Sequence, residues 1–587
     1  MMKFLSKKSL TNKQIFAFIG LAIFINMLGF FVPVLSSNDS NFYAVIAKNI
    51  VLSNDWVNLT FNGQDWLDKP HFPFWLITIS YKIFGVNTFA YILPGFLFNV
   101  LGGYYTYLLA KHLFASKEVG LLSALIYFTS LHLMISSIDI RQEAYLLGEI
   151  IPACYYWYLY NEHPQINKKF LLLGAFFTAL AMMTKGIFIL LTIFSGLIIL
   201  WCVIGKWRNF LSIKWLLALI VSFIFITPEL LALYIQFDMH PNKVVFGQTG
   251  VSGIGWFFWG SQFGRFFDIG PITSGKSDSI GHYFYFIHTF LWAILPWSFI
   301  FIFAASNVLK SIKSHKEVLE NFQTKKNRLN YIYLVGAFIP TFILFSLTKF
   351  QLDHYTNILI PFACILCGEF LFNTTTKLTK HPIFFIQIVL SYILGILVLI
   401  LALLTLNSKF FIILLVFVIV ILGIFVALNN NYPLTKVIVY SVLSICLVFV
   451  FVESINATLY PKYDLGYQVT KKLSILLKDK KIIDYNVNSL SLEFLTKGIY
   501  KRVNTIQGLA NESQPFYLVI DENDLKTIND NNKHILSYKL LLGKFDFIKQ
   551  EKFIPTLFNR EKRKKETNTI FLYLVTPIQG SSNDTKI

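Results

Sequence analysis

Charged residues are scarce in this sequence. They make up 14% of its 587 residues, whereas hydrophobic residues make up 55% and the mean hydropathy is +0.58. Soluble domains carry about 25% charged residues, and a soluble chain of this length could not bury so much apolar side chain. This deficit excludes an ordinary soluble enzyme, a disordered protein and a fibrous repeat. It favours a polytopic α-helical membrane protein, and the continuous apolar runs disfavour a transmembrane β-barrel.

Several features that would mark other classes of protein are missing. We find no Gly-rich nucleotide loop, no convincing metal cluster of His, Cys and carboxylate side chains, and no internal repeat typical of two-halved transporters. Cysteine is rare, and no cysteine is placed to form a disulfide across an extramembrane loop. All five lie inside apolar runs: Cys154, Cys202, Cys364, Cys367 and Cys446.

Thirteen apolar segments are candidate membrane spans. They cover residues 14–34, 88–113, 117–137, 143–160, 169–183, 186–204, 212–236, 284–307, 330–349, 355–373, 382–405, 409–428 and 434–454. An odd number of spans places the two termini on opposite sides of the membrane. We therefore expect about thirteen transmembrane helices.

The basic residues indicate how these spans are oriented. The net charge is +19, and the connection 308–329 is rich in lysine and arginine. Basic connections stay in the cytoplasm, which puts the N-terminus there and two long loops, 35–87 and 237–283, on the opposite side. The charge favours anionic headgroups or phosphorylated substrates, so membrane lipids are expected partners and nucleic acid is not.

The composition changes at residue 456. Residues 1–455 form the expected transmembrane domain, and 456–587 carry more charge and strand-like pieces such as 481–485, 516–520 and 570–574. These features predict a small extracytoplasmic α/β domain. It contains a basic cluster that is either a solvated loop or a surface for an anionic membrane or glycolipid: Arg560, Lys562, Arg563, Lys564 and Lys565.

Ionisable side chains gather on the extracytoplasmic side of the predicted spans. Asp39 follows the first span, Lys69 lies in the first long loop, and Lys185 lies between the fifth and sixth spans. Taken singly, each also fits a structural role, as a helix end, a snorkelling lysine or an interfacial anchor. Together, a carboxylate and several cations at headgroup depth suit a phosphate-linked amphiphilic substrate.

The order of the motifs resembles that of GT-C membrane glycosyltransferases. Asp39-Ser40-x-x-Tyr43, then Trp66-Leu67-Asp68-Lys69-Pro70, resembles the first extracytoplasmic loop of the lipid A 4-amino-4-deoxy-L-arabinose transferases, which are distant cousins of the protein O-mannosyltransferases. Thr184-Lys185-Gly186 and the segment 349–355, followed by Pro361, are similar to later family motifs. The resemblance covers residues 14–375; beyond that, only the position and size of the C-terminal domain match.

The resemblance implies an enzyme that moves a sugar from a polyprenyl-phosphate donor to an extracytoplasmic acceptor, by an inverting displacement. The acceptor would be lipid A, another glycan or glycolipid, or a protein. Asp39 would be catalytic, with Glu143 as a second acidic residue, and the donor phosphate would be bound by Lys69, Arg265, Tyr355 and Lys185. We expect Tyr43, Trp66, His71 and His354 to line the substrate site.

Some positions depart from the family pattern, and they leave the sugar and the acceptor open. Ser40 follows the aspartate where glutamate is frequent, and Trp66 stands where tyrosine is usual. No cofactor is certain, although some relatives bind a divalent metal, and His71 with Asp68 or Asp39 could hold one.

Other function classes remain open at this point. A transporter or flippase of lipid-linked saccharides is the main alternative, and an envelope scaffold or a glycan polymerase are others. The Lys/Asn-rich and aromatic composition fits an AT-rich bacterial genome, so we expect the bacterial inner membrane rather than the endoplasmic reticulum.

Overall fold

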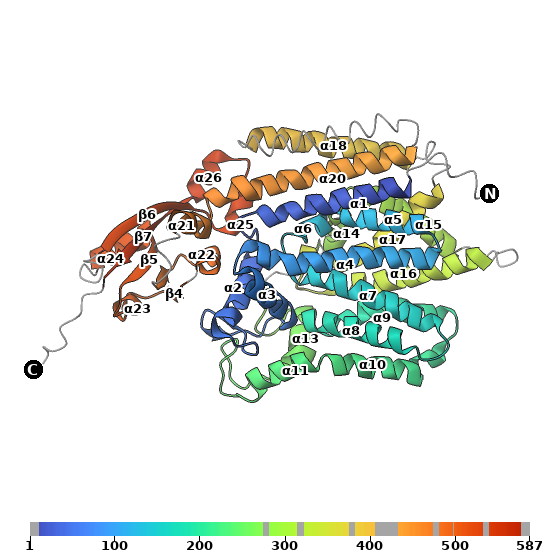
Figure 1. Cartoon of the computed structure of the whole chain (residues 1–587), viewed down its shortest axis with the longest axis horizontal. Helices are drawn as coiled ribbons and strands as arrows, with labels where there is room; N and C mark the ends of the chain where they lie inside the picture. The colour runs from blue at the N-terminus through green and yellow to red at the C-terminus, as the bar shows by residue number, and fades with distance from the viewer. Residues whose placement is uncertain are drawn as a thin grey trace, which may run out of the picture.

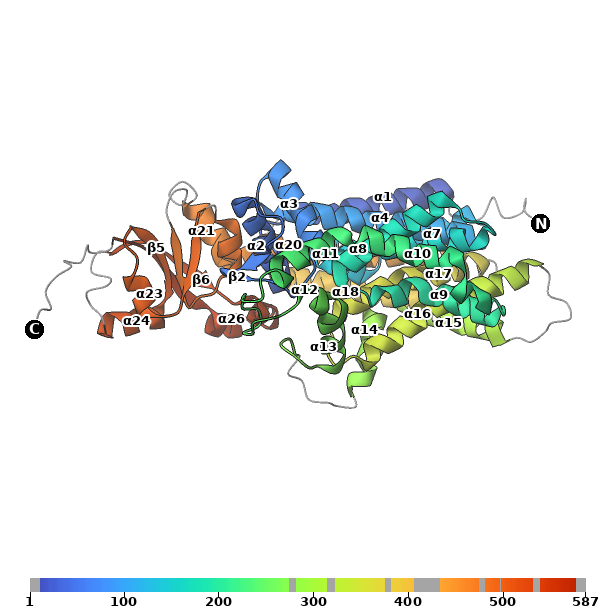
Figure 2. The same cartoon turned by 90° about the horizontal axis from the view of Figure 1, so that it is seen from below.

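The computed structural model describes residues 11–273, 281–313, 322–374, 382–405, 433–473, 481–496, 498–531 and 539–576. A bundle of long helices and a smaller sheet lie at opposite ends of the long axis, and helices α2 and α3 lie between them (Figure 1, Figure 2). The predicted span 409–428 lies outside the described residues.

Among the described residues, six helices are long and apolar enough to cross a membrane, or up to eight if each of two bent pairs is one span. The six are α1 with its 3-10 extension (Asn12–Phe31), α4 (Thr88–Phe114), most of α16 (Phe322–Leu347), η5 with α17 (Asp353–Thr374), α18 (Pro382–Thr405) and α20 with η7 (Leu434–Lys462). The predicted helical membrane fold is present, and the number thirteen stays a prediction.

The remaining bundle helices are not among these six. They are α5 (Lys117–Phe128), α6 (Leu131–Ile135), α7 (Gln142–Glu162), α8 (Lys168–Lys185), α9 (Ile189–Val203), η2 (Trp207–Leu211), α10 (Ile213–Phe225), α11 (Thr227–Leu233), η3 (Tyr234–Asp238), α14 (Gly281–Ala293) and α15 (Ser298–Lys313). Helix α7 packs between α4 and α8, and α9 packs against α16.

One predicted span, 284–307, is two helices rather than one. The direction of the chain bends by 114° from α14 to α15, across a break between Ala293 and Ser298. Pro296 lies in this break. Proline lacks the backbone N–H that a continuing helix needs and its ring disfavours helical backbone before it, so the helix ends there.

The first long loop is largely helical. It contains α2 (Asn38–Ser53), a two-residue hairpin of β1 (Thr60–Phe61) and β2 (Gln64–Asp65), and α3 (Phe72–Phe84). Helix α2 begins where it does because the Ser37 side chain accepts a hydrogen bond from the Ser40 amide at 3.1 Å. Asp39 therefore lies in the first turn of α2, where the helix dipole favours a negative charge.

The second long loop lies beside the same end of the bundle. It contains α12 (Gly253–Gly255), the π-helical turn η4 (Trp256–Gly260) and α13 (Ser261–Phe267). Gly186, directly after α8, has φ +95°, and a Cβ there would lie 2.2 Å from Gln262 Nε2. The positive φ favours glycine at this position, and a larger residue would also displace the Gln262 side chain; Gly186 ends α8 with Lys185 in the last turn.

The C-terminal part contains a five-stranded sheet with the order β4-β3-β5-β7-β6. Strands β4, β3 and β5 are parallel, and β7 runs antiparallel to both β5 and β6. The strands are β3 (Ile482–Tyr485), β4 (Tyr500–Val503), β5 (Phe516–Asp521), β6 (Lys539–Phe547) and β7 (Asn568–Val575). The strand-like pieces noted in the sequence lie in β3, β5 and β7.

Helices cover both faces of this sheet. They are α21 (Leu465–Leu473), α22 (Leu490–Leu495), α23 (Ile506–Ala510) and α24 (Glu522–Asn531). Between β6 and β7 the chain forms α25 (Gln550–Phe553), η8 (Ile554–Thr556) and α26 (Arg560–Glu566), and Phe553 belongs to the core of the bundle. Alternate residues of β5 belong to two separate cores, Tyr517 with Leu465 on one face and Leu518 with Leu525 on the other. This alternation is what a sheet buried on both faces requires.

The sheet region is joined to the first loop by buried contacts. Phe494 of α22 is part of the hydrophobic core formed by α2 and α3, and its ring stacks on Tyr81 with centroids 6.3 Å apart. The buried Lys48 Nζ of α2 donates to the carbonyl oxygens of Glu493 and, at 2.6 Å, Thr496. These carbonyls end α22, so the lysine pairs backbone groups that the helix itself leaves free.

Candidate functional site

Six segments meet at the end of the bundle that faces the sheet. They are the start of α2, the residues between β2 and α3, the start of α7, the end of α8, helix α13 and the 3-10 turn η5 (Asp353–Leu359). Helix termini and turns leave backbone and side chains available at their ends, so this meeting point gathers polar groups from distant parts of the sequence.

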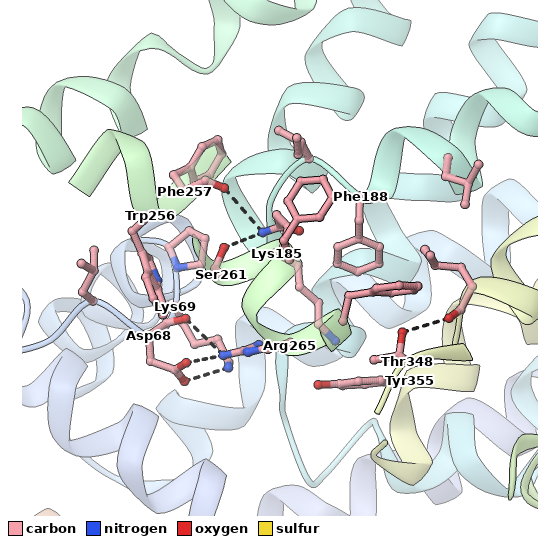
Figure 3. A pocket seen from close by; sticks show the side chains of 18 of the residues that line it. Asp68, Lys69, Lys185, Phe188, Trp256, Phe257, Ser261, Arg265, Thr348 and Tyr355 are labelled. Carbon is pink, nitrogen blue, oxygen red and sulfur yellow. Dashed lines mark hydrogen bonds and ion pairs between the residues drawn. The ribbon is translucent and has the colours of Figure 1, made fainter. Parts of the chain in front are cut away.

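Three cations lie close together at this meeting point. Lys69 Nζ lies 2.7 Å from an Asp68 carboxylate oxygen, and Arg265 of α13 forms an ion pair with the same carboxylate. Lys185 Nζ lies 4.1 Å from the centre of the Tyr355 ring. Figure 3 shows Asp68 between Lys69 and Arg265, with the end of Lys185 above Tyr355.

The charges of this cluster shift one another's protonation. Burial would raise the pKa of Asp68, but the charges of Lys69 and Arg265 outweigh it and lower that pKa to about 2. Burial and the neighbouring Arg265 lower the pKa of Lys69 to about 8. One carboxylate therefore serves two of the cations, and the cluster keeps a positive charge that a phosphate can neutralise.

A second charged group lies around Asp39. Its carboxylate is 3.2 Å from Arg141, which also lies 3.1 Å from Asp139. Asp139 in turn accepts hydrogen bonds from Ser37 and, at 2.7 Å, from Ser40, both at the start of α2. The Asp39 side chain remains 44% exposed, so the arginine orients it and leaves it open to a reactant.

An apolar cavity of about 360 Å³ extends from the cation cluster on one side. Its wall comes from α8–α9, α11, the aromatic second loop and the end of α16. Phe188, Leu191, Leu233, Phe257, Leu344 and Phe345 are among the residues that line it. Such a wall suits a hydrocarbon chain, since it has few polar groups to leave unpaired.

A smaller cavity of about 180 Å³ extends from the cluster on the other side. Asp39, Tyr43, Trp66, Gln142 and His354 line it. The Tyr43 hydroxyl donates to the Gln142 side chain at 3.2 Å, and Trp66 Nε1 is buried with no hydrogen-bond partner among the described residues. Hydroxyl, amide and indole groups beside a carboxylate suit a polar ligand such as a sugar.

The two cavities share part of their walls. Asp68, Lys69, Lys185, Arg265 and Tyr355 line both. The cation cluster is therefore the junction between an apolar and a polar compartment. A ligand that fills both would be amphiphilic, with an anionic group where the compartments meet.

Known proteins are similar to part of this chain. Residues 68–231 match the family model for dolichyl-phosphate-mannose-protein mannosyltransferase. The undecaprenyl phosphate-alpha-4-amino-4-deoxy-L-arabinose arabinosyl transferase of Edwardsiella ictaluri is 23% identical over 56% of this chain and 54% of its own length. An uncharacterized protein of Aquifex aeolicus is 27% identical over 58% of this chain and 61% of its own length. The matches thus span little more than half of these relatives.

Solved structures extend the likeness to nearly the whole chain. ArnT from Cupriavidus metallidurans, bound to undecaprenyl phosphate, has a TM-score of 0.70 at 15% identity and covers 96% of this chain and 98% of that one. The family-model match, the sequence relatives and the shared fold together confirm the predicted resemblance to the 4-amino-4-deoxy-L-arabinose transferases and protein mannosyltransferases. The Archaeoglobus fulgidus oligosaccharyltransferase shares the fold more distantly, with a TM-score of 0.50 at 12% identity over 87% of this chain and 70% of that one.

Most residues expected from the GT-C resemblance come together. Asp39, Lys69, Lys185, Arg265 and Tyr355 line one or both cavities, and so do Tyr43, Trp66 and His354. They come from segments between 39 and 355 in the sequence, and the fold brings them to one end of the bundle.

Two expected residues lie elsewhere. His71 is buried, with Nδ1 2.9 Å from Glu229 and Nε2 2.9 Å from the Val57 carbonyl oxygen, and it lines neither cavity. Glu143 is also buried and forms an ion pair with Lys185, with His354 Nε2 3.8 Å from its other oxygen. The contacts of His71 hold the first long loop in place. The ion pair of Glu143 orients Lys185.

A metal site at His71 does not fit the structure, because both ring nitrogens already have partners. Within the ranges that the structure describes, no group of three or more His, Cys, Asp or Glu side chains could hold a metal ion.

The structure gives two further residues a defined place in this site. Asp68 pairs with two of the cations, and Arg141 contacts Asp39. The sequence offered Asp68 only as a possible metal ligand within the Trp66–Pro70 motif. It placed Arg141 among the ionisable residues on the extracytoplasmic side, but its contact with Asp39 joins residues about a hundred positions apart and left no local pattern.

Proposed function

We propose that this protein is an integral membrane glycosyltransferase. It moves a sugar from a polyprenyl-phosphate donor to an acceptor outside the cytoplasm. The observation that carries the proposal is the junction of an apolar and a polar cavity at three cations. The binding of undecaprenyl phosphate by a protein of the same fold supports it.

The donor fits the two cavities in one orientation. Its polyprenyl chain enters the apolar cavity between α9, α11 and α16, and its phosphate lies among Lys69, Arg265 and Lys185. Its sugar then enters the cavity that holds Asp39. The reverse orientation would bring a hydrocarbon chain against a charged carboxylate and a sugar against phenylalanine and leucine, which leaves polar groups unpaired.

The reaction is a single inverting displacement at the anomeric carbon. The acceptor oxygen forms the new bond to this carbon while the bond from the carbon to the phosphate oxygen breaks. Asp39 takes the proton of an acceptor hydroxyl. The electron pair of the broken bond stays on the polyprenyl phosphate, whose growing negative charge Lys69, Arg265 and Lys185 stabilise.

Arg141 and Glu143 act as positioning residues in this scheme. Arg141 fixes the carboxylate of Asp39 by holding it and Asp139 together. Glu143 forms an ion pair with Lys185 and so holds this lysine at the junction. We propose this role for Glu143 instead of the direct catalytic role that the family resemblance suggested. A base and phosphate-binding cations that are held in the correct position lower the activation free energy of the transfer step.

We assign the protein to the bacterial inner membrane, with the N-terminus in the cytoplasm and the sheet region in the periplasm. The acceptor is lipid A, another glycolipid or glycan, or a protein. Mass spectrometry of lipid A from cells with the wild-type chain and with Asp39→Asn tests the first of these. Loss of a sugar-sized mass in the variant identifies lipid A as the acceptor; an unchanged spectrum rejects lipid A and directs the search to glycopeptides.

A transfer assay separates this function from that of a lipid-linked saccharide flippase. The chain is reconstituted in liposomes with undecaprenyl-phosphate-linked sugars, and both covalent product and movement of intact donor are measured. Product that depends on Asp39 supports the enzyme. Movement of donor across the bilayer without product would contradict it.

A further inference from the structure

A patch on the C-terminal region takes no part in the site described above. Four exposed basic residues, Arg560, Lys562, Lys564 and Lys565, lie on helix α26. Two apolar side chains lie exposed just before this helix, Ile554 at 74% and Phe558 at 57%. We call these six residues the basic patch. Exposed large apolar side chains beside a group of cations are typical of surfaces that lie on a membrane.

The basic patch lies at the end of a membrane-spanning helix. The span formed by α20 and η7 ends at Lys462. Tyr460, in its last turn, packs against Phe553 with ring centroids 4.9 Å apart, and the Ile548 amide donates to the Tyr463 carbonyl at 3.2 Å. Phe553 directly precedes Ile554, so the patch begins next to the end of this apolar helix. Figure 1 shows α26 beside this end of α20.

Internal contacts hold α26 in place. Arg563 is half-buried: it donates to the Thr556 carbonyl at 3.2 Å and lies 5.8 Å from the Tyr463 ring centre. Asn559 caps the helix by accepting from the Lys562 amide at 2.9 Å. Glu566 pairs with Lys552 at 2.8 Å, and Glu561 is the other acidic residue of this helix, where the basic residues outnumber the acidic ones five to two.

We propose that the basic patch docks on the anionic headgroups of the leaflet at which α20 ends. Ile554 and Phe558 enter the boundary between headgroups and acyl chains, and the four cations bind the phosphates above it. Docking holds the sheet region against the membrane beside the bundle. This role is independent of the proposed transfer reaction, because neither cavity includes any residue of the patch.

Hydrogen–deuterium exchange on the full chain tests this proposal. The protein is placed in nanodiscs of phosphatidylcholine alone or mixed with phosphatidylglycerol, and exchange is followed in peptides that cover residues 550–566. We expect several-fold slower exchange in the anionic nanodiscs, and loss of that difference at high salt, which screens headgroup charge. Equal exchange in the two lipids would overturn the proposal.

Charge reversal identifies the residues responsible. Lys562→Glu, Lys564→Glu and Lys565→Glu together should abolish the lipid-dependent difference, and the milder replacement by Gln should reduce it. Lys526→Glu is the control, because Lys526 is an exposed lysine of α24, at the far end of the sheet region from the bundle (Figure 2). A difference that survives the triple reversal, or is lost equally in the control, contradicts the assignment.

Discussion

The two cavities that meet at Lys69 and Arg265 differ in size and in wall chemistry. The larger, about 360 Å³, is lined mainly by leucine, phenylalanine and isoleucine. The polar groups that line the smaller, about 180 Å³, include two carboxylates, one amide, one histidine, two tyrosine hydroxyls and one indole. The same cations belong to both.

This difference shows how one site can hold an amphiphile in a single orientation. Burial of hydrocarbon stabilises binding in the apolar cavity by roughly 25 cal/mol for each Å² removed from water. In the proposed function, charge-assisted bonds to phosphate act at the junction, and Asp39, which lines the smaller cavity and not the larger one, supplies the proton acceptor. The groups proposed to bind the donor chain and the group proposed to react thus lie in different cavities. A substitution in one cavity should therefore change donor affinity or transfer rate, but not both.

The largest expected effect is at the polar cavity. Asp39→Asn removes the proton acceptor and keeps the shape, so transfer should fall by about 10²- to 10⁴-fold, the usual contribution of a general base. Affinity for undecaprenyl phosphate should not fall. Transfer and binding are measured on the same purified protein.

Asp55→Asn is the matched control, because Asp55 lies in the same loop and accepts from the Val57 and Asn58 amides, as an asparagine oxygen also can. It should transfer at the wild-type rate. Wild-type transfer by Asp39→Asn would remove the basis of the mechanism.

Next in size is the effect of a cation at the junction. Lys69→Gln should weaken binding of undecaprenyl phosphate roughly 10- to 100-fold, because a charged hydrogen bond contributes about 1.5–3 kcal/mol. Lys69→Arg should retain most of the affinity. The measurement is a titration with the lipid phosphate in nanodiscs.

Lys82→Gln serves as its control, since Lys82 lies on α3 and bonds to Asn54 away from both cavities. If Lys69→Gln and Lys82→Gln bind equally well, Lys69 does not contact the phosphate.

The protonation of Lys69 gives a third test at the junction. Burial and Arg265 lower its pKa to about 8, so the unbound site loses this charge as the pH rises through 8. Above that pH the site must take up a proton to bind phosphate, and affinity should fall by up to about tenfold per pH unit. Lys69→Arg keeps its charge and should flatten this dependence. An identical pH profile in the two proteins would assign the titration to another group.

The smallest expected effect is at the apolar cavity. Leu191→Asn places a polar amide where the hydrocarbon chain is expected, and it should weaken undecaprenyl phosphate binding by about tenfold, in line with 1–2 kcal/mol of lost apolar burial. Binding of a short-chain prenyl phosphate should change less, because such a chain fills less of the cavity. Equal losses for both ligands would show that Leu191 does not contact the distal chain.

The sequence predicted one part of the sheet better than the other. Strands β3, β5 and β7 are interior, have nearly continuous apolar residues and could be recognised from that pattern. Strands β4 and β6 are the edges, where Lys501, Arg502 and Lys544 face solvent or other side chains and interrupt the pattern. Edge strands are not buried on both sides, so their composition says less about their structure.

The candidate site shows the same limit. The cluster of Asp39, Lys69, Lys185, Arg265 and Tyr355 could be expected, because motif order and predicted topology put all of them on one side of the membrane. The contacts that each of these side chains makes could not be predicted from the sequence. His71 lies two residues from Lys69, yet its ring turns to Glu229, 158 positions away, and such long-range pairs leave no local pattern.

A structure of the full chain in nanodiscs with undecaprenyl phosphate tests the central claim most directly. The account predicts phosphate oxygens about 3 Å from Lys69 Nζ and the Arg265 guanidinium, the distance of charge-assisted hydrogen bonds. It also predicts the polyprenyl chain against Leu191 and Phe345, with the Asp39 cavity left for the sugar. A phosphate away from these cations, or a chain in the Asp39 cavity, would contradict it.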